Sequence, residues 1–328
     1  MSQLVVRLVA ALERDGIPFC QWKGAAALER ALRGERDLDG LVPAAAWPRA
    51  LAAIEGAGWL RARPLGADDE PGVAHFFAYE PGQERLLHLH LHDRVLSGED
   101  WINSHALPLD GDFLASPRRA HGVRVPEPAG EAALALLKHA IRWGSWPDRI
   151  TAWVRPKDEQ AELAALLAEP VLSQAVALLR ERVPALDEAT LRAIAAELRF
   201  AGASVSRTVL AARVRGALRP WSRFDSGGRA AAYLRLVRAR LRRALDRNRR
   251  ERVPAGGSVR LGLAGAPEAV ERAAGELAAW LGPAFRVVRG EAWLCVGDEA
   301  GAREARIDLA RLGDAPGALR AAAWSALA

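Results

Sequence analysis

Hydrophobic positions recur along the chain with two different periods, and the first 128 residues mix both. Short runs such as LDGLV, AHFFAYE and LLHLHLHDRV have the apolar content and alternation that are typical of strands. The EPGQE segment between two of these runs is typical of a turn. AAWPRALAAIEGAGW has helical spacing and ends at glycine. This region is therefore predicted to alternate short strands with helices.

The pattern becomes helical from residue 129 to residue 252. GEAALALLKHAIRW, KDEQAELAALLAE, PVLSQAVALLRERV and DEATLRAIAAELRF each repeat apolar positions every three or four residues, with proline or glycine between them. A last helix is predicted over 228–250, with arginines around a narrow leucine stripe. VPAGG then marks a boundary.

A small α/β unit is predicted over residues 253–328. SVRLGLAG, FRVVRG and AWLCVG are expected to be strands, and APEAVERAAGELAAWLG and PGALRAAAWSALA are expected to be helices. The predicted fold class is α+β, with domains over 1–128, 129–252 and 253–328.

Composition is that of a soluble globular protein: of 328 residues, 50% are hydrophobic and 26% are charged. No run of about 18 uncharged apolar residues occurs, so no membrane-spanning helix is expected. MSQLVVRLVAALERDG is predicted to be an amphipathic helix and lacks the features of a secretory signal. Cys20 and Cys295 form no metal or redox motif, so a cytoplasmic location is expected.

Positive charge is concentrated before the last unit. The net charge is +6, yet residues 207–252 hold fifteen arginines against three acidic residues. Such a segment could bind nucleic acid or an anionic membrane surface. The helix over 228–250 has one aromatic residue, Tyr233, and a narrow leucine stripe. A linker helix with solvated arginines is therefore favoured over a nucleic-acid partner.

Asp37 and Asp39 lie one residue apart at the start of the LDGLV strand. Alternate side chains of a strand share a face, with Cα atoms about 6–7 Å apart, so the two carboxylates could hold one divalent cation. Oxygen ligands suit magnesium or manganese, which would neutralise nucleotide phosphates and orient a displacement at phosphorus. The alternative is a solvated pair at a strand end.

Lys23 and Gly24 precede the helical AAALERAL segment. The glycine would let backbone amides at the helix N-terminus approach a phosphate, and the lysine would add a positive charge. This pattern predicts a phosphate site just ahead of the aspartate pair.

FCQWKGAAALERALRGERDLDGLV resembles the opening of nucleotidyltransferase-fold proteins, whose signature is a glycine-containing turn, a helix and Asp-x-Asp on a strand. It is most similar to bacterial proteins in which such a domain precedes a thymidylate-kinase-like P-loop domain. The resemblance continues through ERLLHLHLHDRVLSGEDWINSHALPLD and GVRVPEPAGEAALALLKHAI. It implies a mixed sheet flanked by helices. It also implies that Asp37 and Asp39 hold nucleotide and metal, and that Lys23 and Gly24 form the phosphate turn. Many such proteins carry a serine where this chain has Ala25.

LLHLHLHD places His88, His90 and His92 on one strand face. Among the resembled enzymes, active ones often carry a third carboxylate on a strand next to Asp-x-Asp, and His90 matches that position best. The histidine strand is therefore predicted to lie directly beside the aspartate strand, same face to same face. An imidazole can act as a base or can join the aspartates around manganese or, as a less favoured ion, zinc. Arg94 shares the face and could meet a phosphate. The alternative is a hydrogen-bonded polar face packed inside the protein.

RLGLAGAPEAVERAAGEL lies where the resembled proteins would carry a P-loop. No Gly-Lys-Ser/Thr occurs in the chain, so this unit is predicted to be a degenerate P-loop domain that does not bind ATP.

Together these features predict metal-dependent transfer of a nucleotidyl group from an NTP to a small-molecule or protein acceptor, whose identity the sequence does not give. The alternative is a non-catalytic nucleotide- or metal-binding interaction protein. The predicted residues are Asp37, Asp39 and His90 for catalysis, Lys23, Gly24 and Arg94 for nucleotide, and Asp37, Asp39, His90 and His92 for metal.

Overall fold

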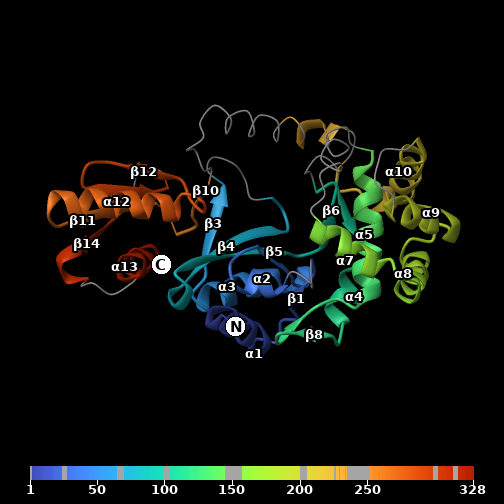
Figure 1. Ribbon diagram of the computed structural model, residues 1–328, viewed down its shortest axis with the longest axis horizontal. Coiled ribbons are helices and arrows are strands. Elements are labelled where there is room, and N and C mark those ends of the chain that lie inside the picture. Colours follow the sequence, from blue (N-terminus) through green and yellow to red (C-terminus); the bar gives the residue numbers. More distant parts are fainter. Residues whose placement is uncertain are drawn as a thin grey trace.

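Three packed regions follow one another along the molecule in the computed structural model (Figure 1). A blue-to-teal sheet layer lies in the middle, green and yellow helices lie at one end, and an orange-to-red α/β unit lies at the other (Figure 1). The structure describes residues 2–23, 28–64, 70–98, 103–144, 157–199, 205–224, 227–228, 230–232, 234, 252–256, 258–297, 302–312 and 317–328.

The central layer is a six-stranded sheet of order β1-β2-β5-β4-β3-β10. β2 and β5 are parallel, and the other neighbours are antiparallel, so the predicted mixed sheet is confirmed. The strands are β1 (Cys20–Gln21), β2 (Leu38–Leu41), β3 (Leu60–Pro64), β4 (Val73–Glu80), β5 (Arg85–His92) and β10 (Arg252–Pro254).

Helices cover one face of this sheet. They are α1 (Gln3–Arg14), α2 (Leu28–Leu32) and α3 (Trp47–Gly56). Leu87, Leu89 and Leu91 of β5 are fully buried in the core that these helices share with the sheet. Because side chains alternate along a strand, the histidines between these leucines lie on the opposite face.

Two short hairpins and a helix lead from the sheet into the helical region. The elements are β6 (Val95–Ser97) paired with β7 (His105–Leu107), α4 (Asp110–Ala115), and β8 (Arg119–Ala120) paired with β9 (Val123–Arg124). The four predicted helices then follow as α5 (Pro128–Arg142), α7 (Lys157–Leu166), α8 (Glu169–Arg182) and α9 (Glu188–Arg199). A further helix, α10 (Val205–Ala217), lies in the region that was predicted to be helical. α5 contacts all four of the others. Most of the arginine-rich segment over 228–250 lies outside the described residues.

The last unit has a four-stranded sheet of order β12-β13-β11-β14. Its elements are β11 (Val259–Ala264), α12 (Pro267–Leu281), β12 (Val287–Arg289), β13 (Trp293–Val296), β14 (Arg303–Asp308) and α13 (Ala318–Leu327). Phe77 and Tyr79 of β4 are buried in its core. The fold class is thus α+β, as predicted, whereas the domain limits at 128 and 252 stay a prediction. Among the described helices, none is both long and apolar enough to cross a bilayer.

Candidate metal and nucleotide site

Asp39 and His90 are paired residues on neighbouring parallel strands, β2 and β5. Residues paired in this way point to the same face of a sheet. Asp39 Oδ1 lies 3.8 Å from His90 Nδ1 and 3.9 Å from His92 Nε2. The predicted contact between the aspartate strand and the histidine strand, same face to same face, is therefore confirmed.

A lysine that follows β1 lies beside the same carboxylate. Lys23 Nζ lies 3.2 Å from Asp39 Oδ1 and 4.2 Å from the centre of the Trp22 ring. Gln21, which is almost fully buried, donates from Nε2 to the Lys23 carbonyl (2.7 Å) and accepts at Oε1 from the Asp39 amide (2.8 Å). Gln21 thereby fixes the spacing between the lysine and the aspartate, a role that sequence reasoning missed.

The surroundings hold Asp39 ionised and His92 neutral. Burial acts to raise the pKa of Asp39, but the His90 ring and the Lys23 ammonium outweigh it and lower the pKa to about 2. Burial, followed by the charge of Lys23, lowers the pKa of His92 to about 3. An ionised carboxylate therefore lies beside a neutral imidazole with one available lone pair, and both are states that bind a cation.

Asp39, His90 and His92 can present one donor atom each within 4.8 Å of one another. His90 Nε2 and both ring nitrogens of His92 are buried and have no hydrogen-bond partner among the described residues, a costly state for a polar atom inside a protein. A metal ligated by imidazole would remove part of that cost. One carboxylate and two imidazoles fit manganese or zinc better than magnesium, which prefers oxygen ligands.

Asp37 has a different partner from Asp39. Its Oδ1 lies 2.8 Å from His88 Nδ1, and its side chain is about half exposed. Burial acts to raise the pKa of Asp37, but the hydrogen bond from His88 and the charges of His88 and His90 together outweigh it, so the pKa is lowered. Among the described residues, neither group of three closely spaced metal donors includes Asp37. Shared coordination of one ion by both aspartates thus stays a prediction.

His75 of β4 is a fourth histidine on this face, and sequence reasoning missed it. It pairs with His90 across the β4–β5 hairpin, and its Nδ1 lies 3.2 Å from His88 Nε2. The sequence contains a signal for this pairing, because a turn at EPGQE places Glu80 opposite Arg85 and therefore places His75 opposite His90.

The other predicted residues are less closely tied to the site. Arg94 follows β5, is exposed, and has its Nε 4.0 Å from Asp93 Oδ1. Among the described ion pairs, none joins it to Asp37 or Asp39. Gly24 lies outside the described residues.

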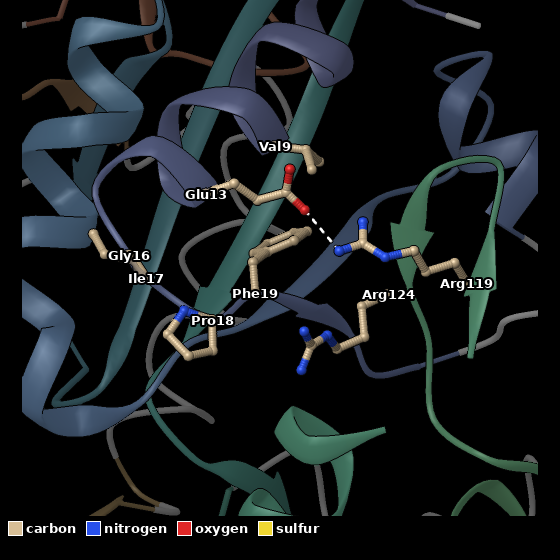
Figure 2. Close-up of a pocket in the computed structure, with 8 residues that line it drawn as sticks. All are labelled: Val9, Glu13, Gly16, Ile17, Pro18, Phe19, Arg119 and Arg124. Atoms are coloured by element: carbon tan, nitrogen blue, oxygen red, sulfur yellow. Dashed lines mark hydrogen bonds and ion pairs between the residues drawn. The ribbon is translucent and has the colours of Figure 1, made fainter. Parts of the chain in front are cut away.

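A separate cavity of about 260 Å³ lies between the end of α1 and the β8–β9 hairpin (Figure 2). Glu13 Oε1 and Arg119 Nη2 form an ion pair of 2.7 Å beside it, and Phe19 and Arg124 also line it (Figure 2). Its lining contains no histidine and neither aspartate of the site described above. The cavity is therefore distinct from the Asp39 group.

No protein-family model matches the chain, and no curated protein matches it either. Two solved structures are similar to part of it. A candidate nucleotidyltransferase from Helicobacter pylori has 15% identity and a TM-score of 0.27, covering 66% of this chain and 94% of its own. JHP933 from Helicobacter pylori has 15% identity and a TM-score of 0.28, covering 66% of this chain and 91% of its own. These values are too low to assign the chain to a family.

Proposed function

We propose that this protein is a divalent-metal-dependent nucleotidyltransferase. The observation that carries the proposal is the surroundings of Asp39, whose Oδ1 lies 3.2 Å from Lys23 Nζ and within 4.8 Å of donor atoms of His90 and His92. A carboxylate beside two imidazoles can hold a cation, and a lysine at the same position can bind a phosphate that the cation also contacts.

Asp39, His90 and His92 would hold the metal, which would neutralise phosphate charge and orient a displacement at phosphorus. Lys23 would exchange its ion pair with Asp39 for a contact with the nucleotide phosphates. Gly24 and Arg94 remain phosphate contacts proposed from the sequence alone. The base role of His90 also stays a prediction, because its Nδ1 faces Asp39 and its Nε2 is buried.

The proposed reaction takes an NTP and an acceptor hydroxyl on a small molecule or a protein. The hydroxyl oxygen forms a bond to the α-phosphorus, and the bond from that phosphorus to the bridging oxygen of the β-phosphate breaks. Pyrophosphate leaves, and the hydroxyl proton passes to a base. The product is a nucleotidylated acceptor.

One observation favours a second function, that of a non-catalytic protein that binds nucleotide or metal. The β5 positions beside Asp39 carry imidazoles, whereas a carboxylate would provide the anionic ligand that two-metal transfer chemistry uses. Such a protein would bind the same metal and NTP without releasing pyrophosphate.

Calorimetric titration of the full chain with each NTP, with and without manganese, tests the proposal. We expect manganese-dependent binding that Asp39→Asn weakens at least tenfold. Asp15→Asn is the matched control and should leave NTP binding unchanged. Asp15 is a surface aspartate whose Oδ1 lies 3.5 Å from Arg14 Nε. The proposal would be overturned if NTP binding were unchanged both by removal of the metal and by Asp39→Asn. Pyrophosphate release separates the two functions.

A further inference from the structure

A second group of metal donors lies beside the Asp39 group, on the same face of the sheet. His75, His88 and His90 present one nitrogen each within 4.8 Å of one another. His75 and His90 are paired across β4 and β5, and His88 lies two residues from His90 on the same strand face. The ring centre of His90 lies 4.4 Å from the ring centre of His75 and 4.4 Å from that of His88.

Asp37 fixes which nitrogen of His88 faces its neighbours. An ionised carboxylate only accepts hydrogen bonds, so at 2.8 Å the Nδ1 of His88 carries the proton and donates to Asp37. The Nε2 of a neutral His88 then carries the lone pair and accepts a hydrogen bond from His75 Nδ1 at 3.2 Å, a bond that a metal ion would replace. A carboxylate that accepts from the far nitrogen of a histidine is the usual support of a histidine that ligates a metal.

A stacking contact holds the His88 ring in place. Phe77 stacks on His88 with ring centres 4.3 Å apart and planes 4° apart. Neutral imidazoles offer lone pairs, and three of them leave a fourth position of a tetrahedral ion open.

We propose that His75, His88 and His90 form a trihistidine site for a nitrogen-preferring divalent ion such as Zn²⁺, with Asp37 as the orienting carboxylate. This assignment gives Asp37 a role other than sharing an ion with Asp39. It does not rest on nucleotidyl transfer, because the donors bind the ion without nucleotide. Arg252, whose guanidinium lies 6.0 Å from the centre of the Phe77 ring, is a nearby cation that would oppose binding. Asp37 is an anion that would favour it.

His90 belongs to both donor groups, so the test uses the Asp39→Asn protein, in which the trihistidine group alone is intact. Full-length, metal-free protein is titrated with Zn²⁺ by calorimetry without nucleotide, and its Co²⁺ form is examined by visible absorption. We expect one high-affinity ion, and X-ray absorption should show nitrogen ligands at about 2.0–2.1 Å from zinc.

His75→Gln in this background should weaken zinc binding at least tenfold. Asp37→Asn should weaken it about 10–100-fold, the usual effect of losing a supporting carboxylate. His121→Asn is the matched control, because this histidine is exposed on the β8–β9 hairpin and has a φ of 49° that asparagine tolerates. It should bind zinc as the background protein does.

Zinc affinity unchanged by His75→Gln would overturn the proposal. If circular dichroism shows that His75→Gln does not fold, Asp37→Asn decides, and unchanged affinity in that variant overturns the proposal. Because no nucleotide is present, failure of this test leaves the nucleotidyltransferase proposal standing, and failure of nucleotide binding leaves the trihistidine site standing.

Discussion

Asp39 of β2 and His90 of β5 are paired in parallel register, with Asp39 Oδ1 and His90 Nδ1 3.8 Å apart. A slip of one residue between these strands would set a leucine of β5 opposite Asp39 and turn the histidines toward the helical core. The burial of Leu87, Leu89 and Leu91 therefore fixes the register that the polar site depends on. Two segments about fifty residues apart in the chain meet for this reason.

Lys23→Gln should change metal affinity and nucleotide affinity in opposite directions. In the metal-free protein the lysine ammonium is a cation 3.2 Å from Asp39 Oδ1, so it competes with a metal for that carboxylate. Its loss should strengthen manganese binding up to about fivefold, since such partly exposed pairs contribute about 0–1 kcal/mol. Loss of a charge-assisted phosphate contact should weaken NTP binding by about 1.5–3 kcal/mol.

Calorimetry with manganese alone, and then with NTP at saturating manganese, measures both effects. Lys23→Arg is measured beside Lys23→Gln, because arginine keeps the positive charge and lengthens the side chain. If Lys23→Gln left both affinities unchanged, the lysine would have no part in the site.

Acid should destabilise the protein through His92. The pKa of this buried ring is lowered to about 3 in the folded state, whereas an unfolded histidine has a pKa of about 6.5. Between these values the unfolded chain binds a proton that the folded chain does not, so stability falls as pH falls from about 6.5. The lowered pKa values of His75 and His88 act in the same direction. The lowered pKa of Asp39 adds a loss only near pH 4 and below.

Urea unfolding from pH 7 to pH 4.5 measures this dependence. His92→Leu should reduce the slope of unfolding free energy by about 1.4 kcal/mol per pH unit, the value for one proton. His121→Asn, which removes an exposed histidine, should follow the unchanged protein. Parallel curves for His92→Leu and the unchanged protein would show that His92 binds its proton normally.

Local patterns predicted the elements of this fold well. The alternation in LLHLHLHD predicts a strand with histidines on one face, and β5 has that form because its leucines are buried. The helical spacing after residue 129 predicts α5 and the helices that pack on it. These elements can be predicted from the period of the apolar residues alone.

Long-range pairings were predicted only in part. The contact between β2 and β5 was expected from the resemblance, but β10 was not expected to pair with β3, because three residues ending in proline carry no strand signal. β14 was also missed, since REARID has charged residues at exposed positions and few apolar ones. The hydrogen bond from His88 to Asp37 depends on side-chain directions that spacing does not determine.

Gly40→Ala should destabilise the sheet next to Asp39. A Cβ at this position would overlap the ring of Phe19 and lie 3.2 Å from Leu89 Cδ1, on the buried face of β2. Overpacking of a buried site costs about 1–3 kcal/mol. The urea midpoint should fall by the corresponding amount, with the slope of the transition unchanged.

Gly216→Ala is the matched control for that change. Gly216 is exposed in α10, and a Cβ there would meet no atom within 4 Å. Alanine favours a helix over glycine by up to about 1 kcal/mol, so this variant should be as stable as the unchanged protein or more stable. Equal midpoints for both variants would contradict the packing argument at Gly40.

The C-terminal unit should not bind ATP, although β11 and α12 have the strand–turn–helix order of a P-loop domain. β11 ends at Ala264 and α12 begins at Pro267, so only two residues connect them. A phosphate-cradling loop needs a longer glycine-rich turn followed by lysine and a hydroxyl residue. A Cβ on Gly265 would lie 3.3 Å from Leu309 Cβ, so the short turn is packed against the chain after β14.

The charges at this turn also oppose phosphate binding. Pro267 has no amide hydrogen to donate, Glu268 lies in the first turn of α12, and no lysine follows Lys157 in the chain. Each missing charge-assisted contact costs about 1.5–3 kcal/mol, so several together leave no useful affinity. In the full chain carrying Asp39→Asn, calorimetry with magnesium and millimolar ATP should detect no binding. Magnesium-dependent ATP binding that survives Asp39→Asn would mean that a nucleotide site exists outside the Asp39 group, and the C-terminal unit would be the first place to look for it.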